Sequence, residues 1–218
     1  MNNIKFFLPA ILILALSCAK KQGNAVAVTP NVNQELINEI ENMNSPAAKK
    51  ASYVLLNPQE RLTLWQRHLA NYMGADLSAA QKTHLKALQN YITAETFSDN
   101  RDMSKIEQFT EPWYATAKQI FDKTLLNDIT SGISNQTYIV SLVSAINTRA
   151  ENSQLAARLA KSSTLGAQPD DILDCNCATQ SDYCNGSLSC ASGTGCNIQG
   201  YCGFLLSYKC NGKCQDNG

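Results

Sequence analysis

The sequence predicts a mainly α-helical protein, in which a small helical bundle over about 30–162 is followed by a small disulfide-rich C-terminal module. Two observations lead to this prediction. In the first part, apolar residues recur at the spacing of one helix face, and helix-start motifs precede several of these runs. In the last part, eight of the nine cysteines lie from Cys175 to Cys214, and none lies between Cys18 and Cys175.

Length and composition set the broad class. The chain has 218 residues, and 44% of them are hydrophobic, which is enough for a buried core. Lysine plus arginine and aspartate plus glutamate balance at 18 each, so no basic surface for nucleic acid is expected. No stretch reaches the ~20 apolar residues that a membrane-spanning helix needs.

The first 17 residues are predicted to be a signal peptide rather than part of the fold. Lys5 precedes an apolar run from Phe6 to Leu16, and Ser17 and Cys18 follow it. This ending resembles a bacterial lipobox, although Ala15 stands where the motif usually has leucine. The resemblance implies cleavage before Cys18, diacylation of Cys18 and a membrane anchor. The alternative is a simple secretory signal with an incidental cysteine.

Residues 18–30 are polar and are expected to form a flexible tether. By analogy with lipoprotein sorting, Ala19 after the lipid cysteine implies delivery to the outer membrane. The number of cysteines fits this interpretation, because nine would leave an odd thiol in an exported chain. Lipidation of Cys18 leaves an even set of eight, all in the tail.

The body, 31–162, is predicted to consist of helices in order. The first covers 32–43, and Ser45-Pro46 starts a second that runs to Leu56. Asn57, Pro58 and Glu60 form a capping box with proline in the first turn, and they start a third helix that stops near Gly74.

The remaining helices follow from similar patterns. Ser78 and Gln81 form a second capping box, and the helix after it should pair with the preceding one as a hairpin. Thr110-Glu111-Pro112 is expected to open the next helix, with Trp113 directed inward. Ser131-Gly132 breaks the chain, and 135–160 is predicted as one long helix. A short strand at 138–140 is the alternative there.

No catalytic constellation is recognised, so the chain is not expected to be an enzyme. Its two histidines, His68 and His84, lie on the two arms of the predicted hairpin and could meet, but no further metal ligand is obvious beside them. Two partly exposed helix histidines are the simpler interpretation. We therefore expect neither a metal nor a cofactor.

Residues 163–174 are rich in Ser, Gly, Pro and Asp and break the helical pattern, so they are predicted to link the body to the cysteine module at 175–218. An exposed linker of this kind is a site for proteolysis, which would release the tail. A hinge between permanently joined parts is the alternative.

The module is expected to be held by four disulfides, because an exported chain reaches an oxidising compartment and paired CxxC zinc knuckles are absent. A metal cluster is the alternative. The sequence does not determine which of 105 pairings forms, but Cys175 and Cys177 are too close to bond each other readily. The predicted disulfide residues are Cys175, Cys177, Cys184, Cys190, Cys196, Cys202, Cys210 and Cys214.

Apolar residues of the module are concentrated in the segment YCGFLLSY. Since so small a unit can bury little surface, these residues are a candidate contact surface for a membrane or a partner. A small core or a hairpin strand is the alternative. The candidate residues are Tyr201, Phe204, Leu205, Leu206 and Tyr208.

The stretches CNCATQSDYC, SCASGTGC and YKCNGKC resemble fulvocin C, a small eight-cysteine bacteriocin, and the whole chain resembles the bacteriocin fulvocin C-related proteins. The likeness covers Cys175 to about Cys214, and the spacing of the last two cysteines departs from it. The resemblance implies an antibacterial module that acts on an unknown target of related bacterial cells. The alternative is a non-toxic envelope lipoprotein whose module binds a protein or the cell wall.

Overall fold

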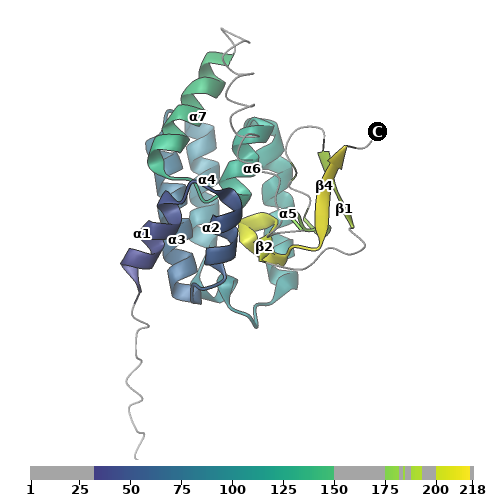
Figure 1. Ribbon diagram of the computed structural model, residues 1–218. Coiled ribbons are helices and arrows are strands. Elements are labelled where there is room, and N and C mark those ends of the chain that lie inside the picture. The colour runs from purple at the N-terminus through teal and green to yellow at the C-terminus, as the bar shows by residue number, and fades with distance from the viewer. Residues whose placement is uncertain (1–31, 150–174, 182–183, 185–187, 193–199, 217–218) are drawn as a thin grey trace, which may run out of the picture. The chain divides into compact units, whose positions relative to one another are not determined.

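The computed structural model describes residues 32–149, 175–181, 184, 188–192 and 200–216 (Figure 1). The predicted signal peptide, tether and linker, and the end of the predicted helix over 135–160, lie outside these residues. Residues 32–149 form the helical body. Its helices are α1 Gln34–Asn42, α2 Pro46–Tyr53, α3 Pro58–Gly74, α4 Ala79–Tyr91, the 3₁₀ turn η1 Ala94–Phe97, α5 Met103–Ile120, α6 Lys123–Ser131 and α7 Gln136–Arg149.

The described residues from 175 to 216 form the cysteine module, which contains two short antiparallel sheets. Strand β1, Leu188–Ser192, pairs with β4, Gly212–Asp216. Strand β2, Tyr201–Cys202, pairs with β3, Tyr208–Lys209, on either side of the 3₁₀ turn η2, Phe204–Leu206. The structure is thus mainly helical with a small disulfide-bonded module near the C-terminus, as the sequence predicted.

Both predicted capping boxes are present. The side chain of Asn57 accepts hydrogen bonds from the Gln59 and Glu60 amides, and Ser78 caps α4 with Gln81. Glu60 also joins two helix starts, because its carboxylate accepts from the Asn57 amide at 2.8 Å and from the Asn33 amide at 3.0 Å. These contacts explain why a glutamate that is only 5% exposed is stable in the body.

Two boundaries differ from the prediction. Helix α5 begins at Met103 rather than at Pro112, because Asp102 caps it by accepting from the Ser104 and Lys105 amides. Pro112 lies inside the helix, and the buried face continues through Ile106 and Trp113 on both sides of it. Asp122 caps a separate helix, α6. The alternative strand at 138–140 does not form, since these residues lie in α7.

The two histidines have separate surroundings. His84 is half-buried, stacks on Trp113 at 4.6 Å and donates to the Trp113 carbonyl at 3.0 Å. His68 is only 2% exposed, which corrects the expectation of a partly exposed residue. Its Nε2 donates to the Asp128 carbonyl at 3.0 Å, because α3 packs against α6 at this level.

A polar network surrounds His68. The Asp128 carboxylate accepts from the Tyr72 hydroxyl and, at 2.7 Å, from the Ser134 hydroxyl. Lys49 Nζ donates to the Ile133 carbonyl at 2.6 Å. The network therefore joins α2, α3, α6 and the segment between α6 and α7, and its described members satisfy one another.

Acid is expected to destabilise the body through His68. Burial lowers the pKa of His68 below its usual 6.5, although the nearby Asp128 carboxylate opposes this shift. The unfolded chain therefore binds a proton at pH values where the folded chain does not. Stability contributed by this group is complete above about pH 6.5 and is lost as the pH falls below that value.

Urea unfolding at about pH 8 and about pH 5 measures this effect. A His68→Gln variant should show a smaller difference in unfolding free energy between the two pH values than the wild type. An equal difference in both proteins would exclude His68 as its source.

Candidate functional site

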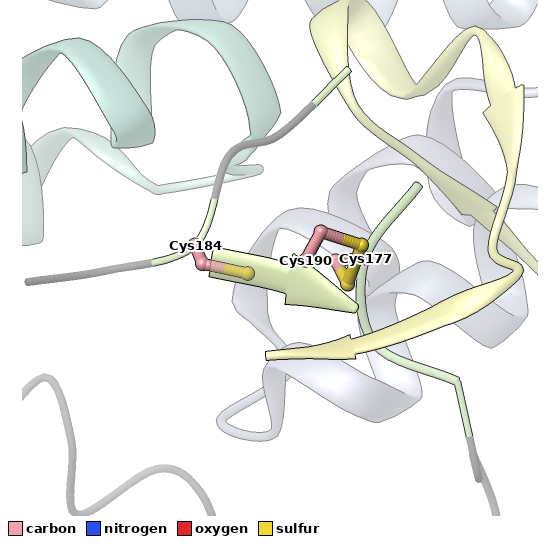
Figure 2. A group of neighbouring side chains, drawn as sticks. All are labelled: Cys177, Cys184 and Cys190. Atoms are coloured by element: carbon pink, nitrogen blue, oxygen red, sulfur yellow. A yellow bond between two sulfur atoms is a disulfide. The ribbon is translucent and has the colours of Figure 1, made fainter. Parts of the chain in front are cut away.

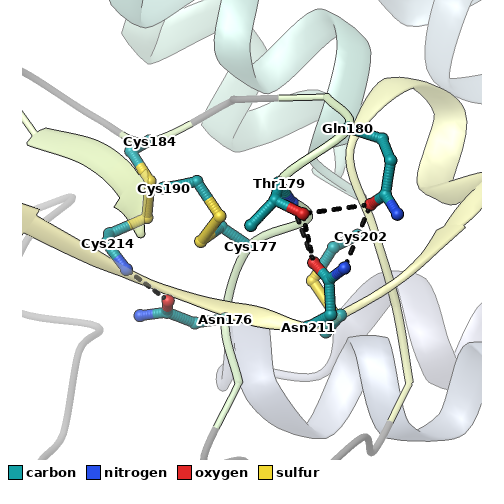
Figure 3. Close-up of a disulfide and its surroundings, with 10 residues drawn as sticks. Asn176, Cys177, Thr179, Gln180, Cys184, Cys190, Cys202, Asn211 and Cys214 are labelled. Carbon is teal, nitrogen blue, oxygen red and sulfur yellow. Dashed lines mark hydrogen bonds between the residues drawn. A yellow bond between two sulfur atoms is a disulfide. The ribbon is translucent and has the colours of Figure 1, made fainter. Parts of the chain in front are cut away.

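Disulfides organise the cysteine module. Cys177 bonds Cys190, and Cys184 bonds Cys214 (Figure 3). Cys202 bonds Cys210. Cys175 is also disulfide-bonded. The sequence did not determine this pairing. Cys190 lies opposite Cys214 in the β1–β4 ladder, yet the two bond different partners, Cys177 and Cys184. Cys196 lies outside the described residues.

Three of these sulfurs are close neighbours. Figure 2 shows Cys177, Cys184 and Cys190, whose Sγ atoms all lie within 4.8 Å of one another. Metal binding by cysteine requires the thiolate, and each of the three sulfurs is in a disulfide. Gly212 permits this close packing, because a Cβ there would lie 2.6 Å from Cys190 Sγ.

Amide side chains join the segments between the disulfides. Asn211 Oδ1 accepts from the Thr179 amide at 2.8 Å, and Asn211 Nδ2 donates to Gln180 at 3.2 Å (Figure 3). Asn176 accepts from the Cys214 amide at 2.9 Å. Polar contacts and disulfides thus hold the part of the module around β1 and β4, while apolar contacts are found around β2 and β3.

The Cys202–Cys210 disulfide closes a loop with an unusual backbone. The tip of this loop, here called the apolar tip, consists of Phe204, Leu205 and Leu206. Leu205 and Leu206 both have a φ of 51°, and no other described residue except glycine has a positive φ. The left-handed conformation costs a non-glycine residue roughly 1–2 kcal/mol, so the contacts of the tip must offset it.

Gly203 precedes the apolar tip and also has a positive φ, 72°. Here glycine is required for two reasons. A side chain would adopt this conformation with strain, and a Cβ would lie 2.7 Å from Ser181 Cβ and 2.9 Å from the Tyr208 ring.

The apolar tip is buried in the core of the helical body. Its residues are 1%, 0% and 2% exposed, and they belong to the same cluster of buried side chains as Trp65 and Leu69. The Phe204 ring packs edge-on against Trp113 of α5 at 5.5 Å, and η2 contacts α6. The predicted contact surface is therefore not an exposed face. Its contact is made within the chain, since the module has too few apolar residues to bury the tip itself.

Tyr201 makes the second part of the contact. Its ring packs edge-on against Tyr53 of α2 at 6.0 Å, and β2 lies beside α2 (Figure 1). The Arg61 guanidinium lies 4.8 Å from the centre of the Tyr201 ring and that of Arg101 lies 5.9 Å from it. Such cation–π contacts contribute about 0.5–2 kcal/mol each.

Hydrogen bonds complete the contact. Arg101 Nη2 donates to the Ser207 carbonyl, and its Nη1 donates to the Ser98 carbonyl at 2.9 Å. Asn127 of α6 donates to the Cys184 carbonyl at 3.2 Å. Tyr208 is half-buried at the edge, where burial first and the Glu107 carboxylate second raise the pKa of its phenol.

The hydrogen bonding of this contact is incomplete. Among the described residues, three buried side-chain polar atoms have no hydrogen-bond partner, namely Arg61 Nε, Arg101 Nε and Ser207 Oγ. All three lie where the module meets the body. An unsatisfied buried polar atom costs about 1–3 kcal/mol.

Comparison of the chain with protein-family models, with curated proteins and with solved structures returned no match. The resemblance to fulvocin C therefore stays a prediction based on the cysteine-rich stretches.

Most residues on the body side of this contact were not predicted from the sequence. Trp113 was expected to point inward, but not toward the module. Arg61 and Arg101 belong to no recognisable motif, because only the fold brings each of them close to the Tyr201 ring. The capping-box asparagine and glutamate before Arg61 were the only local pattern near it.

Removing the aromatic pair tests the contact. Phe204→Ala and Trp113→Ala are each expected to destabilise the chain by about 3–5 kcal/mol, because each leaves a cavity. The double variant should cost less than the sum of the two by about 1 kcal/mol, since both delete the same contact. Urea unfolding gives all three values.

A matched control combines Phe204→Ala with Ile37→Val, since Ile37 lies in α1, which contacts α2 and α3. These two effects should add. Additivity of the Phe204 and Trp113 variants as well would mean that the two rings do not interact.

Peptide mapping under non-reducing conditions tests lipidation through the disulfides. Six described cysteines bond one another, and Cys175 is also disulfide-bonded, so the mapping asks which cysteine is linked to Cys175. If Cys18 carries lipid, its sulfur is occupied, and Cys175 must be linked to Cys196. A Cys18–Cys175 link would rule out the lipid anchor.

Proposed function

We propose that this chain is an exported, lipid-anchored precursor of an antibacterial protein, in which the helical body covers the apolar tip of the cysteine module. The single observation that supports this is the burial of Phe204, Leu205 and Leu206 in the core of the body. A toxic module must be harmless to its producer, and a covered contact surface would keep it so. The module would act by binding a target on related cells, not by catalysis.

The anchor and the location belong to the same proposal. Lipid on Cys18 would hold the precursor in the cell envelope, at the outer membrane. None of the helices in the described ranges is both long enough and apolar enough to cross a bilayer. Cleavage within 163–174 would then break the covalent link between module and body, so that only noncovalent contacts hold them together.

A second candidate is a non-toxic envelope lipoprotein. The shared core favours it, because a module that completes the core of the body is also what a permanently joined protein would have. In that case the module and the body would bind a protein or cell-wall partner as one unit.

Controlled cleavage distinguishes the two candidates. A specific protease site replaces residues 164–168 of the otherwise complete chain, and the protein is cut with its disulfides intact. The module is then separated from the body under denaturing, non-reducing conditions and diluted onto lawns of related strains. We expect inhibition by the separated module, less by the cut but unseparated chain, and none by the uncut chain.

Reduced and alkylated module is the control, because it has the same composition without the disulfide-closed loops. Absence of inhibition by a module whose disulfides are verified by mass would refute the antibacterial proposal and leave the second candidate. Equal inhibition by the cut and uncut chains would refute masking by the body, but not the antibacterial activity of the module.

A further inference from the structure

Strain and unsatisfied polar atoms gather at one place in the described part of the chain. The three unpartnered buried polar atoms and both left-handed leucines all lie where the cysteine module meets the helical body. The interior of the body differs, because its polar network around Asp128 and His68 is satisfied. Such a distribution is expected of a contact that is less stable than the elements it joins.

Most residues of the core that the apolar tip shares lie on the helices. Leu64, Leu69, Leu85 and Leu88 are at most 1% exposed and lie on α3 and α4, which contact each other. Loss of the apolar tip would therefore leave this part of the body packed. On the module side, the Cys202–Cys210 disulfide would continue to hold the loop closed.

The loop has the chemistry of a segment that enters a lipid interface. Three large apolar residues form its end, and tyrosines at 201 and 208 flank them. Tyrosine favours the boundary between acyl chains and headgroups, with its ring in the first and its hydroxyl in the second. Lys209 follows at the exposed edge of β3, where it could meet an anionic headgroup. Because the disulfide holds the loop closed, less conformational entropy is lost when it inserts.

We propose that the contact between module and body opens without unfolding of the helices, and that the apolar tip then inserts into a phospholipid bilayer containing anionic lipid. The inference rests on the proposed function, because it names the surface on which the antibacterial module would act. The body covers the tip with apolar side chains, and its Arg61 and Arg101 lie against the neighbouring Tyr201.

Two variants of the full chain loosen the same contact from opposite sides. Arg101→Ala removes the hydrogen bond to the Ser207 carbonyl and the contact with Tyr201, and it leaves the apolar tip intact. Leu205→Asn makes the tip polar, and asparagine tolerates the left-handed conformation at this position. Circular dichroism and non-reducing mass analysis establish that both variants keep their helices and disulfides.

Hydrogen exchange of residues 204–208 reports opening, and sedimentation with vesicles of phosphatidylethanolamine and phosphatidylglycerol reports insertion. Both variants should exchange faster than the wild type. Arg101→Ala should also bind vesicles about tenfold more tightly, because a charged hydrogen bond no longer holds the tip on the body. Leu205→Asn should bind no better than the wild type.

Each other outcome overturns the inference. Equal vesicle binding by both variants would mean that the tip is not the inserting surface. Fast exchange without vesicle binding in Arg101→Ala would leave an apolar protein surface as the partner. Unchanged exchange in both would show that the contact does not open.

Vesicle binding and growth inhibition test the inserting surface and the antibacterial function separately. Vesicle binding by Arg101→Ala with no growth inhibition by the separated module would contradict the function and keep the inserting surface. Growth inhibition without vesicle binding would contradict only the inserting surface.

Discussion

Phe204, Leu205 and Leu206 are buried among side chains of helices that precede them by many residues in the chain, and the arrangement of the module depends on this contact. Full burial of one such side chain contributes about 1.5–3 kcal/mol. The three together outweigh the left-handed backbone of the two leucines, which costs roughly 1–2 kcal/mol each. Without the body, the module would have to expose these residues or rebuild the loop.

The two halves of the module are stabilised by different means. Near β1 and β4, two adjacent disulfides and the amides of Asn176 and Asn211 hold the segments together. Near β2 and β3, one disulfide closes a loop whose base packs on Cys175 and Ala178 of the module and whose apolar tip is buried by the body. Disulfides restrict the unfolded chain, but they do not cover apolar surface. The module therefore needs both its disulfides and the cover that the body gives to its apolar tip. This cover makes the body a candidate for a masking role.

Buried polar groups are fully hydrogen-bonded in the Asp128 network of the body, but only partly at its contact with the module. Asp128, Tyr72, Ser134 and His68 exchange hydrogen bonds and connect α3, α6 and the segment between α6 and α7. At the contact, Arg61 and Arg101 are placed around Tyr201 with one guanidinium nitrogen each left without a partner. A satisfied network specifies one arrangement, whereas an unsatisfied one lowers the free energy needed to separate the surfaces.

The sequence alone predicted the helical class, the capping boxes that start α3 and α4, and a disulfide-bonded tail in which the cysteines are concentrated. These depend on local patterns, because a cap needs only its neighbours three residues away. It did not determine the early start of α5, since Asp102 competes with a second plausible start at Pro112. The disulfide pairing and the burial of the apolar tip became apparent only in the folded structure. Both depend on which segments, distant in the sequence, come into contact. The placement of Arg61, Arg101 and Trp113 near the module depends on the same contacts, and the spacing of residues along the chain does not specify them.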